Sequence, residues 1–196
     1  GLGDVYKRQA KKHFEAAIEK QTWKNPNPYN GECYFNLGLA EYFLGNESAA
    51  YDAFYKSTWS QETQSAGFYW LALLACKKHE YEQALTFAEQ SMIRNWHNMK
   101  VRALKASILR KLGRCNKDFL TESLAIDPLS LDCLYEKSVS EDDLSGWIST
   151  MRTSAHNYLE VALDYIKAGL YEDVVRILDA TPDKSPMTWY LSLIHI

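Results

Sequence analysis

Residues 34–40 read YFNLGLA and residues 68–74 read FYWLALL, so two similar aromatic and apolar segments stand 34 positions apart. Ala50 and Ala84, which follow these segments, are separated by the same 34 positions. Between residues 50 and 57 the apolar or small residues recur three and four positions apart, which is typical of an amphipathic helix. The sequence therefore predicts an all-α chain in which a pair of helices is repeated.

Small residues recur at matching places in the predicted helices. They allow paired helices to approach closely while bulkier neighbours fill the space beside them. In the first helix of each pair they are Gly38, Ala72 and Ala162, and in the second helix they are Ala50 and Ala84. A second set of glycines is predicted to end the first helices in a left-handed conformation, namely Gly45, Gly113 and Gly169.

This pattern resembles the tetratricopeptide repeat family. The resemblance also covers Phe54, Tyr165 and Pro186, which stand at aromatic and proline positions of the repeat. It implies an α-solenoid, a superhelix of stacked antiparallel helix pairs, because one repeat cannot bury its apolar face alone. The third repeat departs from the pattern, since Arg102 and Lys105 occupy positions that are normally apolar.

The predicted boundaries divide the chain into six segments. Both ends resemble translated sequencing-adapter read-through, so we expect an internal piece of a longer protein whose repeats continue upstream. Residues 1–9 and 191–196 are predicted to be foreign ends, and residues 10–30 a helix of a truncated repeat (10–20) followed by a loop. Residues 31–128 are predicted to form three repeats and residues 155–190 a further one. Between them, residues 129–154 are predicted to be an irregular insert with helices at 129–138 and 141–152.

Two longer segments carry a narrower resemblance. Residues 25–40 (NPNPYNGECYFNLGLA) and 159–178 (LEVALDYIKAGLYEDVVRIL) are similar to the repeat region of large bacterial proteins that also carry a sugar-enzyme-like domain of unknown function. This resemblance implies an accessory or dimerisation module of a carbohydrate-related protein.

The amino-acid composition indicates which classes of partner the chain is expected to bind. The 196 residues carry a net charge of −3 with a pI near 6.0, so neither a nucleic acid nor a membrane partner is expected. Four cysteines lie far apart without a CxxC pair, which favours buried free thiols in a reducing compartment such as the cytoplasm over a disulfide or metal site.

No stretch of the sequence has the spacing of a catalytic, cofactor or metal motif. HExxH, GxGxxG, GxSxG and the phosphate-binding loop pattern are absent from the sequence. The acidic run at 141–143 is interpreted as the start of a helix, where carboxylates favour the helix dipole. We therefore predict a non-catalytic protein-interaction scaffold, with an RNA-binding helical repeat or part of an enzyme with its site in another domain as alternatives.

Basic residues concentrate between Arg94 and Lys117, where eight occur without an acidic residue. On the predicted helix, Lys100, Ser107 and Lys111 share one face. The resemblance places this face on the concave side, where such repeats bind extended peptides. We predict a docking site for an acidic segment or a terminal carboxylate, with a solvated basic face as the alternative.

The rest of the predicted concave face is aromatic and apolar. Exposed rings there could anchor a protein partner or a second copy of the chain, or the next helix could cover them. The residues are Phe35, Leu39, Tyr42, Tyr69, Trp70 and Leu73. Because Phe35 and Leu39 stand where some members of the family clamp a carboxylate with Lys and Asn, that clamp is not expected.

Overall fold

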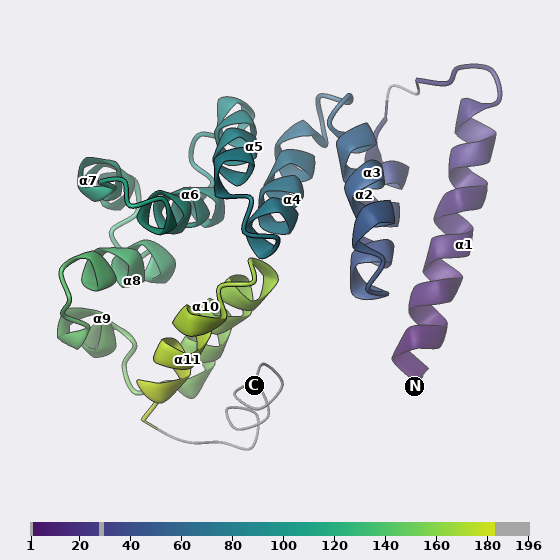
Figure 1. Ribbon diagram of the computed structural model, residues 1–196. Helices are drawn as coiled ribbons and strands as arrows, with labels where there is room; N and C mark the ends of the chain where they lie inside the picture. The colour runs from purple at the N-terminus through teal and green to yellow at the C-terminus, as the bar shows by residue number, and fades with distance from the viewer. Residues whose placement is uncertain (1, 28–29, 183–196) are drawn as a thin grey trace. The chain divides into compact units, whose positions relative to one another are not determined.

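The computed structural model describes residues 2–27 and 30–182, and within these ranges the chain forms eleven helices and no strand (Figure 1). The predicted all-α fold is therefore confirmed. The helices are α1 (Leu2–Thr22), α2 (Glu32–Phe43), α3 (Glu47–Ser57), α4 (Gln64–Lys77), α5 (Tyr81–Arg94), α6 (Met99–Lys111), α7 (Lys117–Ile126), α8 (Leu131–Ser140), α9 (Ser145–Thr150), α10 (Ala155–Lys167) and α11 (Tyr171–Asp179).

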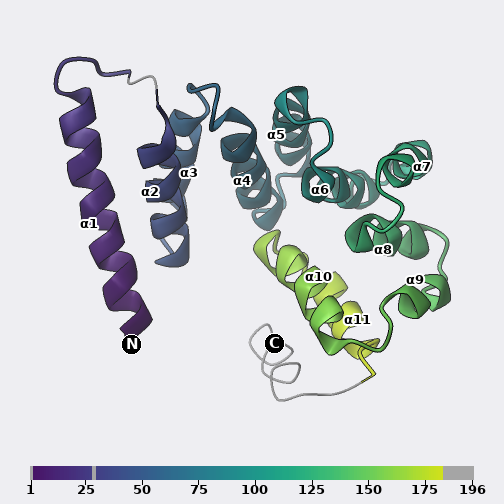
Figure 2. The ribbon, with the colours of Figure 1, turned by 180° about the vertical axis from the view of Figure 1, so that it is seen from behind.

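The chain divides into two compact units. The first unit comprises Gly1–Leu74 and Thr86–Trp96, and the second comprises Ala75–Leu85 and His97–Ile196. Helices that are consecutive in sequence pack together within each unit: α1 with α2 and α2 with α3 in the first, and α6 with α7, α7 with α8, α8 with α9 and α10 with α11 in the second. Figures 1 and 2 show α2 beside α3 and α10 beside α11 from opposite sides.

Close packing of α2 on α3 depends on Gly38. A Cβ atom at this position would lie 2.6 Å from the Phe54 ring, which is closer than real contacts allow. Phe54 is fully buried and also lies beside Phe35, with 5.7 Å between the ring centroids. The missing side chain of Gly38 thus creates the space that the Phe54 ring fills.

Aromatic rings continue this packing through the rest of the first unit. The Trp70 ring of α4 stacks on Phe54, with 5.4 Å between centroids. Phe68 of α4 and Phe87 of α5 stack at 6.1 Å. Ring pairs at these separations stabilise a core beyond the area that they bury.

In the second unit, a small apolar cluster joins α6, α7 and α8. Its buried members are Ala103, Ala106, Leu120 and Cys133. The insert between the predicted repeats packs around Trp147 of α9, which is 1% exposed and donates its indole N–H to the Leu131 carbonyl at 3.0 Å. The insert is therefore an ordered part of this unit.

Left-handed turn residues recur at a fixed interval. Gly45, His79 and Gly113 have positive φ values of 83°, 61° and 68°, and each stands 34 residues after the one before. Gly169 at the α10–α11 turn also has a positive φ, of 71°. His79 is the member that the sequence did not reveal, because residues other than glycine uncommonly adopt this conformation.

Three predicted features differ from the structure or lie outside it. Helix α1 begins at Leu2 instead of near residue 10, so residues 2–9 continue the helix. The first helix of the insert has the predicted length but lies two residues later, at 131–140, and the second is shorter than predicted, at 145–150, so the acidic run at 141–143 precedes this helix instead of starting it. Pro186 and residues 191–196 lie outside the described residues.

Candidate functional site

The predicted concave-face residues differ in how exposed they are. Leu73 and Ser107 are each 1% exposed, so both side chains lie in the interior of their units in this structure. Of the aromatic members, Tyr42 lies against the Trp70 ring, with 4.9 Å between centroids. The remaining predicted members, Phe35, Leu39, Tyr69 and Trp70, are half-buried.

The structure pairs the predicted basic residues of α6 with carboxylates of the same chain. The Lys100 ammonium lies 3.0 Å from the Asp132 carboxylate and 2.5 Å from that of Asp164. Lys111 lies 3.0 Å from the Glu172 carboxylate and 3.7 Å from that of Asp173. The carboxylates that a partner was predicted to supply to Lys100 and Lys111 thus come from the second unit itself.

Arg110 stands at the centre of this ionic network. Its guanidinium donates to both oxygens of the Glu136 carboxylate at 2.9 and 3.0 Å, and to Asp173 at 3.0 Å. Tyr165 donates to Glu136 at 2.6 Å, and Tyr135 donates to Asp173 at 3.1 Å. Buried carboxylates require such donors, because an uncompensated charge is costly away from water.

Burial and charge pull the pKa values of this network in opposite directions. Burial raises the pKa of the Glu136 carboxyl, while the hydrogen bond and charge of Arg110 oppose that rise. Burial likewise raises the pKa of Asp132 against the opposing charge of Lys100. The cationic partners therefore limit how far burial raises the pKa of these carboxyls.

Arg102, which interrupts the apolar pattern of the third predicted repeat, is fully buried. Its guanidinium lies 4.7 Å from the Phe119 ring centroid and donates to Ser123 at 2.8 Å and to Glu122 at 2.8 Å. The guanidinium plane packs on the ring as an apolar side chain would, while its N–H groups find acceptors. Arg102 is therefore part of the interior.

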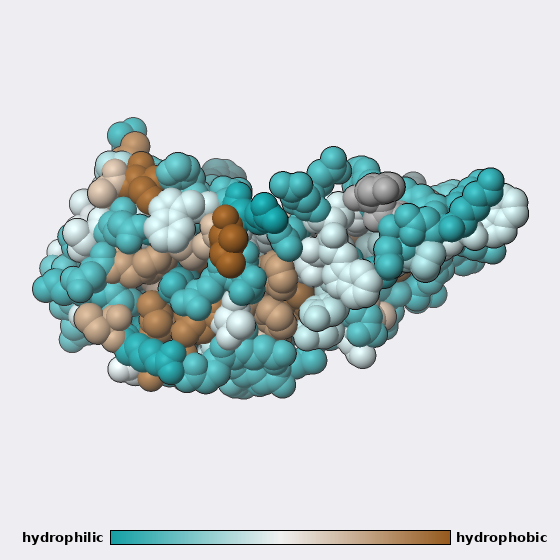
Figure 3. Space-filling model, turned by 90° about the horizontal axis from the view of Figure 1, so that it is seen from above, coloured by the Kyte–Doolittle hydropathy of each residue, from teal (hydrophilic) through white to brown (hydrophobic). Residues whose placement is uncertain are grey.

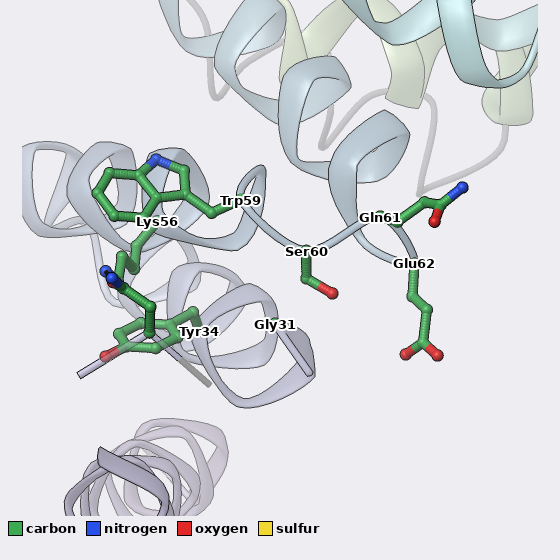
Figure 4. A pocket seen from close by; sticks show the side chains of 8 residues that line it. Gly31, Tyr34, Lys56, Trp59, Ser60, Gln61 and Glu62 are labelled. Atoms are coloured by element: carbon green, nitrogen blue, oxygen red, sulfur yellow. Dashed lines mark hydrogen bonds between the residues drawn. The ribbon is translucent and has the colours of Figure 1, made fainter. Parts of the chain in front are cut away.

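An accessible pocket lies in the first unit, where α2 begins and α3 ends (Figure 4). Its volume is about 450 Å³. Figure 4 shows the Lys56 side chain between the Trp59 indole and the Tyr34 ring. The lining residues are Asn27, Gly31, Tyr34, Lys56, Trp59, Ser60, Gln61 and Glu62.

Backbone packing sets the position of the two rings. A Cβ atom on Gly31 would collide with the Thr63 hydroxyl and lie 2.9 Å from the Ser57 carbonyl, so only glycine allows α2 to start this close to the end of α3. The Thr63 hydroxyl donates to the Ser57 carbonyl at 2.7 Å and holds the segment that follows α3. This turn leaves Trp59 62% exposed at the rim of the pocket.

The chemistry of the pocket is aromatic and polar. The Lys56 ammonium lies 3.7 Å from the Trp59 ring centroid and 6.0 Å from that of Tyr34. It also donates to the Asn27 side-chain oxygen at 2.6 Å. Partial burial raises the pKa of the Tyr34 hydroxyl, so this group stays protonated near neutral pH. The pocket can offer ring faces, amides, a hydroxyl and a carboxylate to a ligand.

Sequence reasoning missed this pocket. Its signal was weak: Trp59 follows the end of a predicted amphipathic helix, and Lys56 stands three residues before it. A tryptophan just after a helix reads equally well as a residue of the core. Its exposure depends on the turn that ends α3, and this turn is not specified by a distinctive local pattern.

The described residues contain a second cavity, in the second unit. This cavity of about 720 Å³ beside α7 is lined by residues of α6, α7 and α8 and the turns next to them. Burial raises the pKa of Cys76 to about 12 and that of Cys133 to about 11, which makes both thiols unreactive. Within residues 2–27 and 30–182, no group of histidine, cysteine or carboxylate side chains has the arrangement of a metal site.

Three further findings concern the surface of the protein, the length of its helices and its similarity to known families. On the face in Figure 3, apolar residues form separate patches among hydrophilic ones. In the part of the chain that the structure describes, no helix is both long and apolar enough to span a bilayer. No family model matches the chain.

Proposed function

We propose that this chain is a tetratricopeptide-type helical repeat that binds a protein partner without catalysing a reaction. Support for the repeat comes from consecutive helices that pack in pairs and from left-handed turn residues at Gly45, His79 and Gly113, spaced by 34 residues. These features favour stacked helix pairs of the α-solenoid type.

The observation that carries the binding proposal is the Trp59 pocket, meaning the cavity lined by Asn27, Tyr34, Lys56, Trp59 and Glu62 with their neighbours. Trp and Tyr are typical anchors of protein interfaces because they combine a large contact area with few rotatable bonds. A pocket of about 450 Å³ is large enough for one long side chain of a peptide. The partner proposed here is therefore a peptide segment that inserts a side chain at Trp59.

The basic residues of α6 are not used in this proposal. Lys100 and Lys111 already lie within 3.0 Å of carboxylates of this chain. An acidic partner would have to displace these intramolecular acids, which are held at high effective concentration.

Selection from a random peptide display library tests the proposal. Peptides selected on the wild-type protein are expected to bind Trp59→Ala at least about tenfold more weakly, which corresponds to a loss of about 1.4 kcal/mol. Trp96→Ala is the matched control, because Trp96 is 50% exposed and does not line the pocket. Calorimetric dissociation constants measure both effects. Selected peptides that bind all three proteins equally, or a library that yields no binder, would contradict the proposal.

A further inference from the structure

The Trp59 pocket already contains a cation. The ammonium of Lys56 lies 3.7 Å from the Trp59 ring centroid, which is well within the range of a cation–π interaction. The Tyr34 ring centroid stands 6.0 Å away, and the Asn27 oxygen accepts a hydrogen bond at 2.6 Å. Two ring faces and an amide oxygen therefore surround one positive charge.

The remaining groups of the pocket also suit a cation. Glu62 lines the pocket, and its carboxylate has no hydrogen bond or ion pair with another described residue. Gln61 and Ser60 contribute further oxygen atoms to the lining. Apart from Lys56 itself, none of the described residues that line the pocket is cationic. Figure 4 shows Gln61 and Glu62 extending away from the two rings, so the groups that contact the ammonium are the ring faces and the Asn27 oxygen.

We propose that the Trp59 pocket binds the side-chain ammonium of a lysine, bare or methylated, in the partner peptide, and that Lys56 is an internal occupant which this side chain displaces. The inference rests on the proposed function, because it names the chemistry of the residue that the partner inserts. Recognition of quaternary and primary ammonium groups by pairs of aromatic faces follows from the negative potential over the rings.

Occupation by Lys56 has a measurable consequence. A ligand that requires a vacant pocket binds with an affinity reduced by the fraction of time for which the pocket is vacant. Because Lys56 stands three residues from Trp59 in the chain, its local concentration is high and that fraction is small. Lys56→Ala is therefore expected to raise the affinity for a cationic ligand. If Lys56 instead bound an anion, the same variant would lower the affinity for an acidic ligand.

The experiment uses three small probes with the full chain. They are the blocked amino acid trimethyllysine, its neutral isostere with a tert-butyl group in place of the trimethylammonium, and blocked glutamate. Binding is followed by titration calorimetry and by the NMR resonance of the Trp59 indole N–H, which is assigned by its absence in Trp59→Ala. Lys24→Ala is the control, because Lys24 lies 5.6 Å from the centroid of Trp23 and does not line the pocket.

Trimethyllysine is expected to bind Lys56→Ala about tenfold more tightly than it binds wild type or Lys24→Ala. The neutral isostere should bind Lys56→Ala at least about tenfold more weakly than trimethyllysine does, and Lys56→Ala/Trp59→Ala should lose the binding. Equal affinity for the charged and neutral probes would overturn the inference, as would binding of glutamate that disappears in Lys56→Ala.

Failure of this inference can be separated from failure of the proposed function. If display-selected peptides depend on Trp59 but trimethyllysine does not bind Lys56→Ala more tightly than wild type, the peptide site stands and its proposed preference for a cation is wrong. If the selected peptides do not depend on Trp59, the proposed function itself is contradicted.

Discussion

The two units use different chemistry to hold similar helix pairs together. In the first unit, Phe54 stacks on Trp70 and fills the space above Gly38, so aromatic rings join the helices. In the second unit, Arg110 joins α6 to Glu136 of α8 and Asp173 of α11 through charged hydrogen bonds. The difference is one of balance, because the second unit also packs Tyr135 against the rings of Trp147 and Tyr165. Similar helix pairs can thus be joined mainly by rings or by rings together with a buried ionic network.

The largest expected effect concerns the aromatic packing. Phe54→Ala should lower the free energy of unfolding by about 3–5 kcal/mol, because it empties a fully buried site between α2, α3 and α4. Urea unfolding followed by circular dichroism measures this loss. Tyr55→Ala is the control on the same helix, since Tyr55 is 46% exposed and should cost much less. Equal costs for the two variants would refute the ring-based packing of the first unit.

A somewhat smaller effect is expected for the ionic network. Arg110→Met should lower the free energy of unfolding by about 3 kcal/mol at neutral pH, because it leaves the buried Glu136 and Asp173 without their main cation. Arg114→Met is the control, since Arg114 and its partner Glu82 are 48% and 66% exposed. An exposed pair of this kind contributes about 0.5 kcal/mol.

The cost of Arg110→Met should also depend on pH. Burial raises the pKa of the folded Glu136 carboxyl above its ordinary value of 4.5, and removal of Arg110 removes the largest influence that opposes this rise. The folded variant then takes up a proton at Glu136 more readily than the unfolded chain, so the contribution of this group to stability is fully present below pH 4.5 and is lost as the pH rises through the raised pKa. A destabilisation that stays constant between pH 4 and pH 7, titrated in urea, would contradict this account.

The smallest of the expected effects tests close packing. Gly38→Leu should lower the free energy of unfolding by about 1–3 kcal/mol, because even a Cβ atom there lies 2.6 Å from the Phe54 ring. Gly146→Leu provides the comparison, since nothing lies within 4 Å of the corresponding Cβ atom. Thermal midpoints of the two variants measure the difference, and an unchanged midpoint for Gly38→Leu would show that α2 and α3 are less tightly packed than described.

The helices were predictable because their causes are local. Small residues such as Gly38 and Ala50, the 34-residue interval and the glycine turns at Gly45 and Gly113 are visible in the sequence. The structure places Ala50, Ala72, Ala84 and Ala162 in the core, fully buried. Tyr165 is 5% exposed and combines a place in the core with its hydrogen bond to Glu136.

The candidate site was less predictable, because its causes are contacts distant in sequence. The basic residues between Arg94 and Lys117 were predicted to lie on a surface. Their partners Asp132, Asp164 and Asp173 stand far along the chain, so the sequence did not show that these charges are paired. No local pattern reveals which carboxylate will meet Arg110. Trp59 was missed for a similar reason, since its pocket forms only when the start of α2 meets the end of α3.

We expect a partner to bind at the Trp59 pocket of the first unit, while the cations of α6 pair with carboxylates of the second unit. Amide and indole NMR shifts on addition of a display-selected peptide test it most directly. The account predicts shifts at Gly31, Lys56 and the Trp59 indole, with Lys100 and Lys111 unchanged. Shifts confined to Lys100, Lys111 and their carboxylate partners would contradict it.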